Sequence, residues 1–236
     1  MKRTILPALL ILGFAASPAP LLAATDDVDA VVVGQAPGSV PVSPEVKASA
    51  VAAVNALGKE VVVGHFQVAI DRMYPAWKET LAKAVGGQDK LVEKFSAVPR
   101  LMAQQGMAIL SFQTEGEPVA YEVDSGKEPM LDENGKPVID KASGKPLEKM
   151  TFKKWLLVVP TVTEFRVTEP AKAGQTPKIK VAVNHSFQVA ISDKGKNNWT
   201  FIDGSGLNVA ELRRLFFTLP ETMTLPQIKG EEKKAK

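Results

Sequence analysis

The period of the hydrophobic pattern changes at Gly106, and this change constrains the fold more than any other feature of the sequence. Before Gly106, apolar residues recur three and four positions apart, as on one face of an α-helix. After Gly106, apolar and polar residues alternate, as on a strand whose two faces meet different surroundings. Helices followed by long strands predict an α+β fold, in which N-terminal helices pack on a curled antiparallel sheet of about five strands.

Glycines and prolines divide the chain into elements. We expect four helices before Gly106, over residues 46–57, 59–73, 77–85 and 89–105. Gly58 is expected to end the first helix and Pro99 to bend or break the fourth, because glycine favours helix ends and proline lacks an amide N–H. Strands are expected over residues 107–114, 119–123, 151–167, 179–191 and 199–202, with a last helix over residues 209–217.

The fourth expected strand has the clearest alternation. One of its rows is apolar except for His185. Its other row carries the polar residues Lys180, Asn184, Ser186 and Gln188. We therefore expect the apolar row, with His185, to face the helices or the mouth of a pocket, and the polar row to face water.

The first 24 residues are typical of a cleavable signal peptide. Lys2 and Arg3 precede an apolar run from Ile5 to Ala16, and the small residues Ala23 and Ala24 follow. A run of this length is too short to span about 30 Å of hydrocarbon. The sequence therefore predicts cleavage after Ala24 and a periplasmic or secreted product without a membrane span.

The remainder is predicted to be a single domain with two extensions and one insertion. Residues 25–44 are rich in small residues and proline, which is typical of a flexible leader. The α+β domain is expected over residues 45–220, followed by an extended C-terminal tail over residues 221–236. Residues 124–150 contain three Gly-Lys turns and predict a hairpin insertion.

The composition argues against several kinds of site and partner. The chain has no cysteine, so disulfides and thiol chemistry are excluded. Its two histidines do not have the spacing of zinc ligands, and we expect no metal or other cofactor. Loss of Lys2 and Arg3 lowers the formal net charge from +3 to about +1, which gives no basis for a nucleic-acid partner.

Short strings spread over residues 59–226 carry a resemblance to a known family. They are Asp71–Pro75, Gly86-Gly87, Gln105-Gly106, Ile191–Lys196, Trp199–Asp203, Leu212-Arg213, Leu215–Pro220 and Leu225-Pro226. In their order and spacing they resemble poorly characterised exported bacterial proteins of the nuclear-transport-factor-two-like superfamily. The resemblance implies a cone-shaped α+β fold with a pocket. It implies no reaction, because this scaffold carries both enzymes and binding modules. The insertion at residues 124–150 departs from the family pattern.

Three residues are candidates for catalysis. In isomerase members of the superfamily, residues that line the pocket act as bases. His185 is on the row expected to face the helices or the pocket mouth, so the resemblance makes it a candidate base. Asp71 is a candidate acid or base, and Tyr74 a candidate pocket hydroxyl, where the second helix ends. Each has a structural alternative. His185 can be satisfied by a backbone carbonyl or lie at a rim, Asp71 can pair with Arg72 or with the loop, and the string that contains Asp71 and Tyr74 can serve to build the fold.

Three aromatic residues on the expected strands are candidates for ligand binding. Trp155, Trp199 and Phe201 either line an aromatic pocket or form the core under the helices.

The sequence favours a non-catalytic extracytoplasmic binding or interaction module over an enzyme, because too few polar groups converge for chemistry. A small molecule or an envelope protein is the expected partner, and no pattern specifies an oligomeric state. Two alternatives stay open: a small isomerase- or hydrolase-type enzyme with His185 as base, and a structural envelope protein that assembles through residues 124–150. Convergence of His185, Asp71 and Tyr74 on one cavity would favour the enzyme, and their separation would remove it.

Overall fold

The computed structural model describes residues 36–169 and 176–233, so the expected signal peptide and the leader up to residue 35 lie outside it. Four helices come first: α1 (Pro44–Val62), α2 (Gln67–Asp71), α3 (Pro75–Val85) and α4 (Gln88–Gln104). They are followed by β1 (Met107–Thr114), β2 (Val119–Pro129), β3 (Glu148–Glu169), β4 (Lys178–Asp193), β5 (Thr200–Asp203), α5 (Val209–Leu215) and β6 (Lys229–Lys233). Within these two ranges, no helix combines the length and apolar character needed to cross a membrane.

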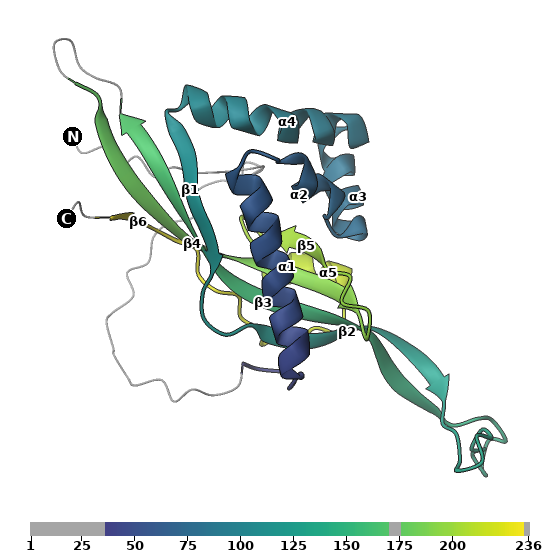
Figure 1. Cartoon of the computed structure of the whole chain (residues 1–236). Helices are drawn as coiled ribbons and strands as arrows, with labels where there is room; N and C mark the ends of the chain where they lie inside the picture. Colours follow the sequence, from purple (N-terminus) through teal and green to yellow (C-terminus); the bar gives the residue numbers. More distant parts are fainter. Residues whose placement is uncertain (1–35, 170–175, 234–236) are drawn as a thin grey trace.

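The strands form one antiparallel sheet around β3 (Figure 1). β1 and β2 pair with different parts of one edge of β3, and β4 pairs with the other edge. β5 and β6 then pair with opposite ends of the outer edge of β4. The predicted α+β class is confirmed as helices with an open antiparallel sheet, which has six strands rather than about five.

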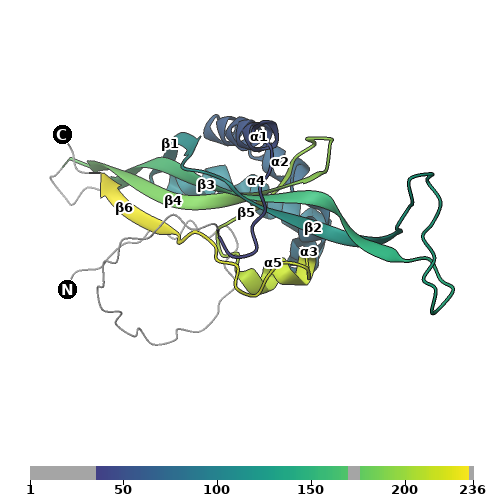
Figure 2. The same ribbon diagram turned by 90° about the horizontal axis from the view of Figure 1, so that it is seen from below.

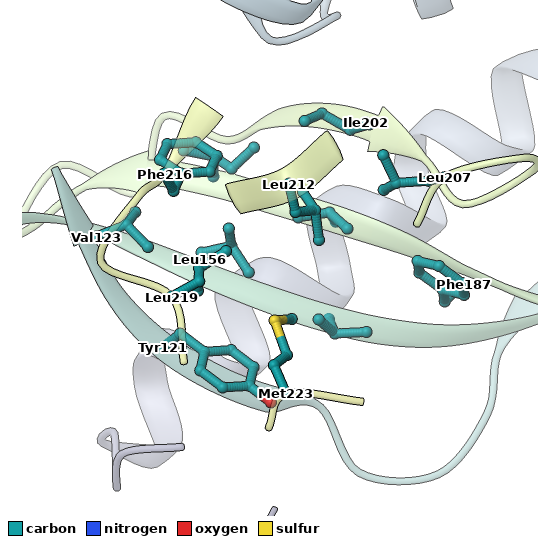
Figure 3. Close-up of a cluster of buried hydrophobic side chains, with 13 residues drawn as sticks. Tyr121, Val123, Leu156, Phe187, Ile202, Leu207, Leu212, Phe216, Leu219 and Met223 are labelled. Atoms are coloured by element: carbon teal, nitrogen blue, oxygen red, sulfur yellow. The ribbon is translucent and has the colours of Figure 1, made fainter. Parts of the chain in front are cut away.

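Protein covers both faces of the sheet, with α1 on one side and α5 on the other (Figure 2). Leu157 and Val159 of β3 pack toward Ala50 and Val54 of α1. The alternate row, including Leu156, packs against α5 and the segment that follows it (Figure 3). The sheet is therefore buried on both faces along its central strands.

The predicted orientation of the two rows of β4 is wrong. The apolar row, with Phe187 and Val189, packs under α5 and the segment up to Met223, on the face of the sheet opposite α1, where Trp77 of α3 also packs against this cluster. The polar row lines a cavity. Alternation shows which residues share a face, but the element that covers each face comes from distant parts of the chain.

α1 continues through Gly58, where the sequence predicted its end. A Cβ atom at Gly58 would overlap the ring of Phe112 on β1, so the glycine allows helix and strand to approach closely. The predicted second helix, over residues 59–73, is accordingly divided between the end of α1 and the short α2. α4 also continues past Pro99, which lies inside the helix.

The C-terminal part adds a strand where the sequence predicted only an extended tail. β6 pairs with β4 from Val181 to His185. Two ion pairs support it: Lys180 Nζ lies 3.3 Å from Glu232 Oε2, and Lys233 Nζ lies 2.7 Å from Glu164 Oε1.

Residues 124–150 form a hairpin that extends from the body of the molecule, here called the arm (Figures 1 and 2). The residues of β3 that precede Lys154 pair only with β2, so the paired part of the arm is a two-stranded ribbon. Its exposed large apolar side chains are Met130, Leu131, Ile139, Leu147 and Met150.

Tyr121 tests the packing on the α5 side of the sheet. Its side chain is buried, and its hydroxyl has no hydrogen-bond partner in the part of the chain that the structure describes. Tyr121→Phe is expected to raise the free energy of unfolding at neutral pH by about 1 kcal/mol, because it removes an unsatisfied buried hydroxyl and keeps the ring. Urea denaturation measures the change, and Tyr121→Leu is the control, which should destabilise because it also loses ring volume.

The same substitution is expected to reduce the loss of stability in alkali. Burial raises the pKa of Tyr121 in the folded protein, whereas an unfolded tyrosine ionises near pH ~10. Above about pH 10 the tyrosine of the unfolded chain ionises while the folded one stays neutral. The free energy of unfolding therefore falls as pH rises, until the folded group ionises as well. Phenylalanine does not ionise, so Tyr121→Phe lacks this loss of stability. A Tyr121→Phe variant less stable than the wild type at neutral pH would show that the hydroxyl has a partner.

Candidate functional site

The candidate site is a cavity of about 790 Å³ between the helices and the sheet. All five helices contribute to its wall, as do β1, β3, β4 and β5. Its apolar wall is supplied mainly by the helices, with Trp77, Leu81, Val98 and Met102 among the lining residues, together with Met73 between α2 and α3. A cavity of this size and character is typical of a site for a small organic molecule.

The polar row of β4 forms a floor to this cavity. Asn184, Ser186 and Gln188 line it from β4, and Thr161 and Thr163 line it from β3. The register places Thr161 opposite Ser186 and Thr163 opposite Asn184, so the polar side chains lie in cross-strand pairs. The floor is therefore polar and uncharged, and the opposite wall is apolar.

Gln188 connects the floor to the rim of the cavity. Its Nε2 donates a 2.6 Å hydrogen bond to Asp203 Oδ2 at the end of β5. Asp203 Oδ1 accepts a second hydrogen bond, of 2.8 Å, from the backbone N–H of Ser205. These two bonds fix both the carboxylate and the orientation of the Gln188 amide.

Two polar atoms of the floor are buried without a partner in the described part of the chain: Gln188 Oε1 and Ser186 Oγ. Gln188 as a whole is only 8% exposed. Buried polar atoms are nearly always hydrogen-bonded, because leaving one unpaired costs about 1–3 kcal/mol. Both atoms are fully buried, so they lie within the packed floor and not on the open surface of the cavity.

The charged residues that line the cavity are Asp203, Glu211 and Arg214. Asp203 and Arg214 are exposed, and all three belong to β5 or α5, so the charges lie at the mouth. Glu211 also serves the helix, since it forms a capping box with Asn208. The described residues contain no group of three or more histidine, aspartate or glutamate side chains that could hold a metal ion.

His185 lies on the opposite face of the sheet from the cavity. Its Nδ1 is 2.8 Å from Glu115 Oε2, and its Nε2 is 3.8 Å from Glu231 Oε1 of β6. The prediction that His185 faces the helices or a pocket mouth is therefore wrong, for the same reason as for the whole apolar row. The structure places it in an ion-pairing cluster at the edge where β6 joins β4.

Asp71 and Tyr74 also lie away from the cavity wall. Asp71 is exposed, and its Oδ1 accepts a 2.9 Å hydrogen bond from Gln67 Nε2 on the same helix. Tyr74 packs against Phe216, with 5.3 Å between ring centroids, and burial raises the pKa of its hydroxyl. It lines a separate hollow of about 360 Å³ together with Lys154. His185, Asp71 and Tyr74 thus lie on three separate surfaces and form no common site.

Of the three aromatic candidates, Phe201 lines the cavity, with the Arg72 guanidinium 4.9 Å from its ring centroid. Trp199 is buried in the core and donates a 2.8 Å hydrogen bond from Nε1 to Ser49 Oγ. Trp155 lies under Lys194, whose Nζ is 4.3 Å from the ring centroid. Neither tryptophan lines the cavity.

Sequence reasoning missed Trp77 and the polar row as parts of the site. Trp77 and Leu81 lie four residues apart on α3, which predicted a buried helix face but not a hollow in front of it. The sequence predicted that Ser186 and Gln188 face water, because alternation alone does not show which face of the sheet the N-terminal helices cover. The available signal was the length of the helical half, which supplies enough apolar surface to cover that face.

Comparison of the chain with protein-family models, with curated proteins and with solved structures finds no match.

Gly58→Ala tests the close contact that shapes one wall of the cavity. In an ordinary helix interior this substitution would stabilise by about 1 kcal/mol. Here it is expected to destabilise by about 1–3 kcal/mol, because the new methyl group must displace the Phe112 ring, which lines the cavity. Urea denaturation measures the effect.

The control is a double-mutant cycle with Phe112→Leu. If the contact with the ring is the cause, Gly58→Ala should cost less in the Phe112→Leu background. A stabilising Gly58→Ala in the wild-type background would contradict the close contact.

Proposed function

We propose that the protein is an exported, non-catalytic binding protein that holds an uncharged, largely apolar small molecule in the cavity between its helices and its sheet. The single observation that carries the proposal is the cavity of about 790 Å³ with its apolar helical wall. The proposal includes the nuclear-transport-factor-two-like fold, with which helices closing a hollow against an antiparallel sheet are consistent. Export rests on the signal-peptide pattern of residues 1–24.

The arrangement of ionisable groups supports binding rather than catalysis. A general base must lie within hydrogen-bond reach of the proton that it removes. Within the described part of the chain, the charged groups that line the cavity are confined to its mouth. The candidate base His185 lies across the sheet from it, paired with Glu115. The isomerase or hydrolase alternative required His185, Asp71 and Tyr74 to meet in one cavity, and they lie apart.

Binding is tested with N-phenyl-1-naphthylamine, a neutral apolar fluorophore whose emission rises in an apolar site. We expect saturable binding to the mature protein and quenching of Trp77, which lines the cavity. Leu81→Trp should weaken binding by about tenfold or more, because the indole occupies cavity space.

Leu101→Trp is the matched control, since Leu101 lies on α4, is 48% exposed and does not line the cavity. It should leave the dissociation constant of the fluorophore unchanged. Absence of saturable binding, or equal binding by Leu81→Trp and wild type, would overturn the proposal.

The arm supports a second candidate function, assembly with another envelope protein or another copy of the chain. Of its five exposed apolar side chains, four lie in the connection between β2 and β3 and one, Met150, lies on β3. The two-stranded ribbon that carries them is of a kind that is only marginally stable in water on its own. Deletion of residues 126–148 is expected to lower the solution mass of the complex, measured by light scattering in an extract from the native host. An unchanged mass would argue against assembly through the arm.

A further inference from the structure

The Asn-Gly turn at the tip of the arm has a chemistry that neither proposed function uses. Asn134 is the one asparagine of the sequence that is followed by glycine. Because glycine has no Cβ atom, its backbone nitrogen can closely approach the side chain of the residue before it. Asn134 and Gly135 are both exposed, and Gly135 has a φ of +76°. This turn is therefore open to a reaction between a main-chain nitrogen and a side-chain amide.

The carboxamide of Asn134 is free to take up the reactive position. The backbone N–H groups of Asn134 and Lys136 donate to Asp132 Oδ1 at 2.8 and 2.9 Å, and the Gly135 N–H donates to the Asp132 carbonyl at 3.0 Å. The Asn134 side chain itself makes no hydrogen bond within the part of the chain that the structure describes. All these backbone bonds lie in an exposed turn, where they open at little cost in free energy.

Asp203-Gly204 is the other pair in the sequence that could form the same five-membered ring. Here both Asp203 carboxylate oxygens accept hydrogen bonds, from Gln188 Nε2 and from the Ser205 N–H. Gly204 is buried, and its N–H donates a 3.0 Å hydrogen bond to the Phe187 carbonyl. Ring formation would break all three bonds. The sequence therefore offers two reactive pairs, and the fold leaves only the one on the arm open.

We infer that Asn134 is a site of spontaneous deamidation in the folded protein. The Gly135 backbone nitrogen loses its proton and attacks Asn134 Cγ. A new N–Cγ bond replaces the Cγ–Nδ2 bond, and ammonia leaves. Water then opens the resulting succinimide ring at either of its two carbonyl groups, and the product is aspartate or isoaspartate. Water is the only co-reactant, so no oxidant, reductant or enzyme is required.

Deamidation changes the tip of the arm in two ways. Both products add a negative charge next to Asp132 and Glu133. Isoaspartate also lengthens the main chain by one carbon atom, which displaces the Lys136 N–H from Asp132 Oδ1. No residue of the arm lines the cavity, so this inference does not depend on the proposed binding function.

The test follows Asn134 and Asp203 in the mature protein at neutral pH, folded in buffer and unfolded in guanidinium chloride. Trypsin releases Asn134 in the peptide 128–141, since the Lys136–Pro137 bond resists cleavage, and Asp203 in the peptide 197–213. Mass spectrometry detects the change from amide to acid, and labelling by isoaspartate methyltransferase detects isoaspartate at either site. We expect Asn134 to convert in the folded protein within about threefold of its unfolded rate, and Asp203 to convert about tenfold or more slowly than when unfolded.

Two glycine substitutions assign the reaction to the Asn-Gly pair. Gly135→Ala is expected to slow the loss of ammonia from Asn134 by about tenfold or more, because the new Cβ atom hinders the attacking nitrogen. Gly144→Ala is the matched control. Gly144 also has a positive φ, of +68°, and open space around its Cβ position, but it follows Ser143. It should leave the rate at Asn134 unchanged.

Conversion of Asn134 only in guanidinium chloride would overturn the inference, because it would show that the turn protects the amide. Equal slowing by Gly135→Ala and Gly144→Ala would also overturn it, since the conformation of the tip and not the Asn-Gly pair would then set the rate. If Asp203 converts as fast in the folded protein as in the unfolded one, the selection of one pair by the fold is wrong. Fluorophore binding tests the binding function separately from all of these outcomes.

Discussion

The register of β3 against β4 determines which side chains meet the helices and which meet the C-terminal segment. It places Val159 opposite Gln188 and Thr161 opposite Ser186, with the polar row toward the cavity. A shift of one residue would turn Phe187 into the cavity and bury the polar row beneath α5. The cavity, its polar floor and the hydrophobic cluster on the other face therefore all depend on this one pairing.

Most of the fold could be predicted from the sequence, because hydrophobic period is a local property that the switch at Gly106 records directly. The errors occur where a contact between residues distant in the sequence determines the local structure. Gly58 reads locally as a helix end, but it is needed for the approach of Phe112 on β1. β6 has no apolar alternation of its own, and it becomes a strand because the outer edge of β4 is free to pair with it.

Less of the candidate site could be predicted. Alternation correctly separated His185 from Ser186 and Gln188 on two faces of one strand, but it could not show which face the helices cover. The segment that covers the His185 side lies after β5, where its apolar residues have no strong period. Phe201, a candidate from the sequence, lines the cavity, whereas Trp155 and Trp199 pack elsewhere because strand position alone does not distinguish a core from a hollow.

α5 lies on one face of the sheet but contributes both to the hydrophobic cluster on that face and to the border of the cavity. Leu212 is fully buried in the cluster of Figure 3, while Glu211, Arg214 and Leu215 of the same short helix border the cavity. Any widening of the entrance by movement of α5 must therefore loosen the packing around Phe187 and Ile202 on the far face. Under the proposed binding function, exchange of a molecule by this route would be tied to the local unfolding free energy of the C-terminal segment. Substitutions that do not contact the cavity, such as at Phe216, would then change the residence time.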